Sequence, residues 1–215
     1  MAFDYKKEFK EFYLPPAKPQ IVKIPKMQFV AVRGTGNPNE EGGEYKRALE
    51  VLYAISYTIK MSKKGDRRID GYFDYVVPPL EGFWWQQKGG ARVAGIDYSR
   101  KDSFNWISLI RLPDFVAKKD FDWAKESVQK KKGLDVSRAE LFKLEEGECV
   151  QIMHKGCYDD EPASVKLMDD FAAQSGYQLD FTDARLHHEI YLSDPRKTEP
   201  QKLKTVIRHP IKSAL

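Results

Sequence analysis

An internal repeat is the feature that most constrains what this chain can fold into. Three short blocks occur twice in the same order along the sequence, and all of them are rich in residues typical of strands. The matched pairs are 29–36 with 149–156, 80–85 with 188–193, and 108–113 with 205–210. A repeat of this kind predicts two copies of one structural unit, because each copy carries the same local signals.

Helical and strand patterns alternate in the same way in both copies. Apolar residues recur at helical spacing over 44–61, and a second helix is expected after Asp159 or Asp160, with Pro162 in its first turn. The segments 139–143 and 149–154 are predicted to be strands joined by a hairpin turn at 146–147. Each copy therefore reads strand, helix, strand, strand. This predicts an α+β fold of two modules in pseudo-twofold arrangement, each with its own curved antiparallel sheet, and a central ligand cleft between them.

Composition changes along the chain predict the domain boundaries. We expect one domain over 1–215, because the length suits two fused halves around an ordinary core. Its expected parts are an N-terminal arm at 1–19, a first module at 20–113, a linking helix at 114–137 and a second module at 138–215.

Composition also excludes several classes of protein. Hydrophobic residues make up 41% of the chain, and no apolar run approaches the roughly 18 residues of a membrane span. The N-terminus has no apolar segment typical of a signal peptide, and the two cysteines are not in metal-binding spacing. A cytoplasmic protein with reduced thiols and no membrane partner is expected.

Charge and aromatic content together indicate the kind of ligand. The 36 basic and 32 acidic residues are mixed along the chain, which indicates a solvated surface and no nucleic-acid partner. The chain contains 12 Phe, 11 Tyr and 4 Trp, many of them near the repeated segments. This favours a site for a flat hydrophobic or cationic aromatic small molecule, whereas a protein partner is left open.

Glu189 lies in the middle of an apolar strand, where a carboxylate is unusual. Because side chains alternate along a strand, His187, Glu189 and Tyr191 share one face, and Ile190 lies on the other. That face meets either solvent or a cleft, and the repeat favours the cleft. There, burial is expected to raise the pKa of Glu189, which could then bind a cation or act as a general base.

The other candidate contacts lie on the first copy and on neighbouring strands. Glu81 occupies the repeat position of Glu189 and either binds ligand or only orients its loop. Trp84 and Trp85 alternate faces, and we assign Trp85 to the cleft and Trp84 to the core, while keeping both as candidate ligand contacts. Trp106 is a further candidate, with core packing as its alternative.

A phenol is expected to supply the hydrogen-bond donor of the site. Tyr158 precedes a capped helix at the cleft mouth and is the first choice, and Tyr191 on the face of Glu189 is the second. His154, His187 and His188 do not form a metal-binding motif, so no metal and no cofactor are expected.

Several segments carry a family resemblance across nearly the whole chain. They are 4–10, 24–29, 34–39, 80–85 and 188–196. Together they resemble the stand-alone branch of the GyrI-like small-molecule-binding superfamily. The resemblance implies two strand-helix-strand-strand modules and a central carboxylate, Glu189. No helix-turn-helix pattern precedes the domain, so direct DNA binding is not expected.

The resemblance also implies two functions. Related multidrug-binding domains meet cationic aromatic ligands, and some stand-alone members hydrolyse cyclopropanoid electrophiles, which carry an activated three-membered ring. The expected function is binding of a flat compound followed by hydrolytic detoxification, with Glu189 and Tyr158 as catalytic residues. The alternative is a non-catalytic module that binds, sequesters or senses such compounds.

Overall fold

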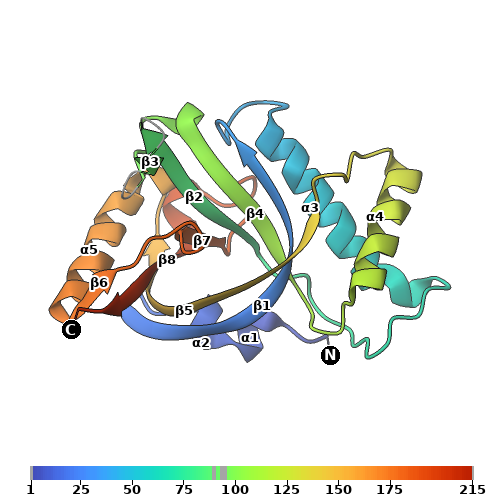
Figure 1. Ribbon diagram of the computed structural model, residues 1–215, viewed down its shortest axis with the longest axis horizontal. Coiled ribbons are helices and arrows are strands. Elements are labelled where there is room, and N and C mark those ends of the chain that lie inside the picture. Colours follow the sequence, from blue (N-terminus) through green and yellow to red (C-terminus); the bar gives the residue numbers. More distant parts are fainter. Residues whose placement is uncertain (1, 89–90, 93–95, 215) are drawn as a thin grey trace.

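One antiparallel sheet organises the fold (Figure 1). The computed structural model describes residues 2–88, 91–92 and 96–214, and the other positions of the expected domain lie outside the described residues. The strands are β1 (Gln20–Thr35), β2 (Leu80–Lys88), β3 (Ala91–Arg92), β4 (Phe104–Leu112), β5 (Glu140–Lys155), β6 (Tyr177–Leu179), β7 (His187–Tyr191) and β8 (Lys204–Ser213).

The sheet closes into a ring through β7, the shortest of the ring strands. Strands pair in the order β3-β2-β4-β1-β5-β8-β6, and β7 pairs with both β2 and β8. The six strands β2, β4, β1, β5, β8 and β7 therefore form a barrel-like ring in which every neighbouring pair is antiparallel. Closure satisfies the backbone groups that an open sheet would leave at its edges.

Helices cover the sheet in three groups (Figure 1). α3 and α4 lie on one side of the molecule, α5 lies on the other, and α1 and α2 lie below β1. Their bounds are α1 (Tyr5–Glu8), α2 (Lys10–Tyr13), α3 (Glu44–Lys60), α4 (Lys118–Lys132) and α5 (Glu161–Gln174), with single 3₁₀ turns η1 (Met61–Lys64), η2 (Lys101–Ser103), η3 (Tyr158–Asp160) and η4 (Pro200–Lys202). Each described helix is too short or too polar to cross a lipid bilayer.

The predicted α+β class is confirmed, and the order strand, helix, strand, strand occurs in both halves. The first half contains β1, α3, β2 and β4 in this order, with the two-residue β3 before β4, and the second contains β5, α5, β7 and β8, with the three-residue β6 before β7. The glycines that follow the long strands, Gly36 and Gly156, both have positive φ, and their amides donate to the carbonyls of Phe104 and Leu203. Superposition of the halves about a twofold axis and the predicted module boundaries stay predictions.

The prediction that each half has its own sheet is wrong. β1 pairs with β5, and β2 pairs with β7, so hydrogen bonds cross between the halves along both seams. The two halves share one sheet because the strand edges of one half find their partners in the other half. Local sequence pattern carries no signal for such long-range pairing.

The predicted hairpin at 146–147 is also absent. β5 runs as one strand of 16 residues and keeps one register with β1 on both sides of this point, with Ile24 opposite Gly147 and Lys26 opposite Glu145. Gly147 has a φ of +68°, and Pro25 on the facing strand has no N–H to donate. β5 therefore continues along β1 past Gly147 and does not turn back.

Apolar side chains pack on both faces of the ring. Inside it, side chains from all six strands meet the aromatic rings of α1 and α2, among them Tyr5, Phe12 and Tyr13. Outside it, one cluster joins β1, β2 and β4 to α3 and α4, and another joins β5 and β8 to α5. β7 lies between these two outer clusters, so its outward side chains are placed where α5 and the first half of the chain meet.

Candidate functional site

The outward face of β7 carries three polar side chains that contact one another. His187 and Glu189 are buried, and Nε2 of His187 lies 2.9 Å from Oε1 of Glu189. The hydroxyl of Tyr191 donates to Oε2 of the same carboxylate over 2.8 Å. The predicted alternation, with these three residues on one face, is confirmed. It places the carboxylate of Glu189 between an imidazole and a phenol.

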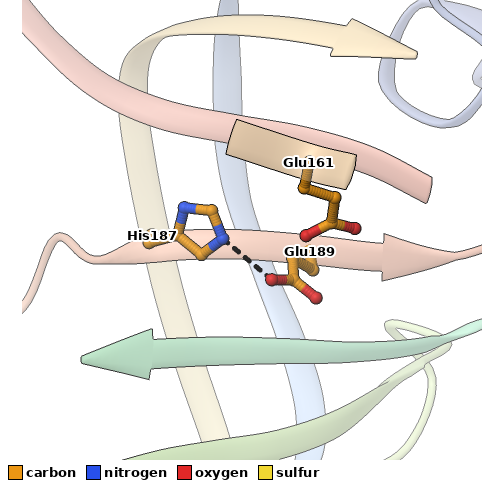
Figure 2. A group of neighbouring side chains, drawn as sticks. All are labelled: Glu161, His187 and Glu189. Carbon is orange, nitrogen blue, oxygen red and sulfur yellow. Dashed lines mark hydrogen bonds and ion pairs between the residues drawn. The ribbon is translucent and has the colours of Figure 1, made fainter. Parts of the chain in front are cut away.

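A second carboxyl group faces this strand from α5 (Figure 2). Glu161 is the first residue of α5, follows the turn η3 and has no exposed surface. Its Oε2 accepts a hydrogen bond of 3.1 Å from the hydroxyl of Tyr98, whereas its Oε1 has no hydrogen-bond partner among the described residues. Sequence reasoning missed Glu161, because an acidic residue in a first helical turn is ordinary and carries no signal of a site.

The two carboxyl groups have opposite protonation preferences. Burial raises the pKa of Glu161 well above its usual range, and the charge of Glu189 raises it further. Burial also opposes ionisation of Glu189, but the hydrogen bonds from His187 and Tyr191 outweigh it and lower the pKa. The expectation of a raised pKa at Glu189 is therefore wrong, because it counted burial without the donors. A proton shared by the two carboxyl groups is therefore held by Glu161 in preference to Glu189.

Two tyrosines flank Glu189. The hydroxyl of Tyr191 accepts a 2.8 Å hydrogen bond from Nε1 of Trp84 and donates its own hydrogen bond to Glu189. The ring of Tyr158 meets that of Tyr191 edge to face, with centroids 5.8 Å apart. Burial raises the pKa of Tyr158 to about 12 and that of Tyr191 well above its usual value. Both phenols therefore keep their protons and can act as donors.

Gly82 makes room for the contact between Trp84 and Tyr191. It pairs directly with Glu189 across β2 and β7. A Cβ at this position would lie 2.7 Å from Nε1 of Trp84 and 3.1 Å from the hydroxyl of Tyr191. Only glycine leaves the two side chains their present positions.

Aromatic rings extend the site into the outer core. Tyr45 of α3 lies 5.4 Å from Trp84 and 5.2 Å from Trp106, measured between ring centroids. Trp106 is fully buried and pairs with Trp84 across β2 and β4. It therefore packs behind Trp84 as part of the core.

The positions of Glu81 and Trp85 correct two predictions. Glu81 pairs with Ile190, so it points into the barrel, where its carboxylate lies 3.0 Å from His188 and accepts from the hydroxyl of Tyr13. Trp85 packs against the inner core, and Trp84 is the tryptophan on the face of Glu189. The placement of Trp84 in the core is confirmed. The assignment of Glu81 and Trp85 to the face of Glu189 is wrong, because Gly82 and not Glu81 lies opposite Glu189, and neighbours on a strand face opposite ways.

Further polar atoms on the outer face have no hydrogen-bond partner among the described residues. Thr205 pairs with Tyr191 and lies on β8 beside β7, whereas Ser108 pairs with Gly82 and lies on β4, one strand beyond β2. Nε1 of Trp106 and Oε1 of Glu161 also have no hydrogen-bond partner among the described residues. Buried polar atoms without partners are costly. A water molecule or a polar group of a ligand would satisfy them.

The same region holds a group of possible metal ligands. Glu161, His187 and Glu189 each offer one ligand atom, and these atoms lie within 4.8 Å of one another. One imidazole and two carboxylates would suit a zinc ion. However, His187 and Glu189 are already bonded to each other (Figure 2), and Tyr191 occupies the second oxygen of Glu189. We therefore describe the group as a hydrogen-bonded acid–base cluster.

Comparison with known proteins identifies the family. The family model for the GyrI-like small molecule binding domain matches residues 17–212. A hydrolase from Listeria innocua is 47% identical, with a TM-score of 0.87 over 98% of this chain and 100% of that chain. A second Listeria innocua protein, an uncharacterized conserved protein, is 48% identical, with a TM-score of 0.90 over the same shares.

A more distant structure shares the fold alone. The C-terminal domain of EcmrR is 12% identical, with a TM-score of 0.54 over 91% of this chain and 98% of that domain. None of the curated proteins compared with the chain matches it. With nearly its whole length matched by the family model, the chain belongs to the GyrI-like family of small-molecule binding domains.

Proposed function

We propose that the protein hydrolyses flat, hydrophobic electrophiles, in particular cyclopropanoid compounds, at the outer face of β7. The observation that carries this proposal is the pair of buried carboxyl groups whose pKa values are shifted in opposite directions. Such a pair supplies a general acid and a general base at one pH. Two Listeria innocua relatives that are 46–47% identical are hydrolases, which supports the same reaction class.

Glu189 acts as the base in this proposal. It removes a proton from a water molecule, and the water oxygen forms a bond to a ring carbon of the substrate. The ring bond between the attacked carbon and the carbon conjugated with the carbonyl breaks, and its electron pair moves through the conjugated system to the carbonyl oxygen. Tyr158 donates a hydrogen bond to that oxygen, with Tyr191 as the second candidate, and Glu161 delivers the proton that neutralises it. The proton on Glu189 then returns to Glu161, which restores both groups.

Aromatic side chains supply the surface for a flat substrate. Trp84, Tyr158 and Tyr191 surround the carboxylate, and Tyr45 and Trp106 support Trp84 from behind. Stacking on these rings would align the electrophilic carbon with Glu189, and alignment is a large part of catalysis. The hydroxyls of Ser108 and Thr205 are available for the attacking water. We assign no cofactor to the reaction and place it in the cytoplasm.

The test is ring opening by the pure protein. An activated cyclopropane conjugated to a carbonyl is incubated with the wild type, and the product is followed by mass spectrometry. General acid–base assistance is worth roughly 10²–10⁴-fold, so Glu189→Gln and Glu161→Gln should each lower turnover by about that factor while the fold is kept. Glu148→Gln removes an exposed carboxylate of β5 and should leave turnover unchanged. Wild-type turnover in Glu189→Gln would show that Glu189 is not the base.

A binding module is the second candidate function. An ionised carboxylate among aromatic rings suits a planar cation, through charge and cation–π contact. In this case the wild type would bind a cationic dye tightly and open no ring. Glu189→Gln would then weaken binding of the cationic dye more than that of a neutral one.

A further inference from the structure

A chain of hydrogen bonds leads from Glu189 to the surface of α5. His187 uses Nε2 towards Glu189, and its Nδ1 lies 2.7 Å from Nε2 of His209 on β8. Nδ1 of His209 lies 2.7 Å from the carboxylate of Asp169 on α5. The side chain of Asp169 is 26% exposed, whereas both histidines are buried. Four titratable groups thus connect the cluster to solvent.

Packing holds the two histidines in place. Their rings meet at a centroid distance of 4.9 Å, and Phe181 packs edge to face on His209 at the same distance. The titratable groups that face the chain are Asp169 beside His209 and, beside Glu189, Tyr191 and Glu161. Buried rings with fixed orientations allow one arrangement of protons.

The positions of the protons follow from the donors and acceptors. The carboxylate of Asp169 can only accept, so Nδ1 of His209 carries a proton. Burial lowers the pKa of His209, so this ring is neutral and its Nε2 is an acceptor. His187 must then donate from Nδ1. Its Nε2 faces a carboxylate, and a hydrogen bond there requires a proton between the two atoms.

The hydrogen bonds also fix the direction of each group. Because Nδ1 of His187 points to His209, only its Nε2 is left to face Oε1 of Glu189. Tyr191 donates to the other oxygen of the same carboxylate, so Glu189 is held from two sides. Asp169 closes the far end of the chain, since its carboxylate sets which nitrogen of His209 carries the proton.

We propose that Asp169, His209 and His187 are positioning residues that fix the direction of the Glu189 carboxylate. This inference rests on the proposed role of Glu189 as a base. It extends the site from the cluster on β7 to β8 and the outer part of α5. None of the three residues needs to contact the substrate.

Histidine NMR tests the chain without any substrate. The protein has 4 histidines, so long-range ¹H–¹⁵N spectra of labelled protein can resolve the tautomer of each ring. We expect a proton on Nδ1 of His187 and on Nδ1 alone of His209. Asp169→Asn keeps an oxygen that accepts from His209, so both rings should keep these tautomers. Asp169→Leu removes the acceptor, so the proton of His209 should no longer be held on Nδ1, and the signals of both rings should change.

A neighbouring carboxylate provides the control. Asp170 lies next to Asp169 on α5 and pairs with Lys166 in the exposed part of the helix. Asp170→Asn should leave the spectra of His187 and His209 unchanged. A proton on Nε2 of His209 in the wild type would overturn the proposal. So would unchanged tautomers of His187 and His209 in Asp169→Leu.

A kinetic readout separates the chain from the reaction itself. If ring opening occurs, Asp169→Leu should lower kcat by roughly 10–100-fold with KM little changed, whereas Asp169→Asn should keep most of the rate, because its amide oxygen still orients His209. A purely structural role for Asp169 would lower the melting temperature of Asp169→Leu without this loss of kcat, and the proposal would fail. If the NMR results are as expected but no compound is hydrolysed, the proton chain stands and the role of Glu189 as a base is wrong.

Discussion

Glu146 provides a quantitative test of the charge network inside the barrel. Its carboxylate lies 2.9 Å from His188 and 2.7 Å from Arg208, and its side chain is 12% exposed. Burial opposes ionisation, but the two cations outweigh it and lower the pKa of Glu146 from 4.5 to about 2. Because the folded pKa is depressed, the ionised group stabilises the folded state above pH 4.5. That stability is lost as the pH falls towards 2.

The size of this contribution follows from the shift. A depression from 4.5 to about 2 corresponds to about 3 kcal/mol near pH 5.5 and to about 1 kcal/mol at pH 3. The pH range 2.5–5.5 isolates Glu146 from His188, because His188 has a raised pKa and is protonated in both the folded and the unfolded state there. Urea denaturation followed by tryptophan fluorescence gives the free energy of unfolding at each pH.

Comparison of two variants completes the test. Glu146→Gln should lose about 3 kcal/mol at pH 5.5 relative to the wild type, and the difference should shrink as the pH is lowered. Glu145→Gln changes the exposed neighbour on the same strand and should change stability by less than about 0.5 kcal/mol at every pH. A difference between Glu146→Gln and the wild type that is independent of pH would refute the argument.

Two further predictions concern the outer face. Gly82→Ala should separate Trp84 from Tyr191, since the new Cβ would lie 2.7 Å from Nε1 of Trp84. The variant should have a lower melting temperature and a lower rate of ring opening. An unchanged melting temperature and rate would contradict the close packing. Trp84→Ala should weaken binding of an aromatic ligand about tenfold or more, as expected for roughly 1–3 kcal/mol of stacking, whereas Trp85→Ala should weaken it much less. Fluorescence titration with the larger effect at Trp85 would place the ligand on the inner face.

Local sequence patterns correctly predicted the faces of β7 and the order of the main elements in each half. The alternation along β7 placed His187, Glu189 and Tyr191 on one face, because the side-chain period of a strand is two. The repeat gave the order of strands and helices in each half, since each copy has its own turns and apolar spacing. Both inferences need only neighbouring residues, and both are confirmed.

The misplaced residues depend on register or on distant contacts. The repeat aligned Glu81 with Glu189, but pairing across β2 and β7 puts Gly82 opposite Glu189, and a shift of one residue exchanges the faces of the strand. Glu161 reaches the site only because α5 packs on β5 and β8. The partner that reverses the pKa shift of Glu189 was visible as His187, two residues away on the same face, but its hydrogen bond depends on side-chain geometry.

The two faces of β7 differ in how their charged groups are paired. This difference indicates which face stabilises the fold and which face carries the chemistry. On the inner face, His188 lies between Glu81 and Glu146, and Arg208 pairs with Glu146, so each charge meets its opposite. On the outer face, two carboxyl groups, Glu161 and Glu189, lie in one buried cluster. Like charges held together destabilise a fold unless one group keeps its proton. A network whose only task was stability would not contain such a pair, so we assign the chemistry of this protein to the outer face.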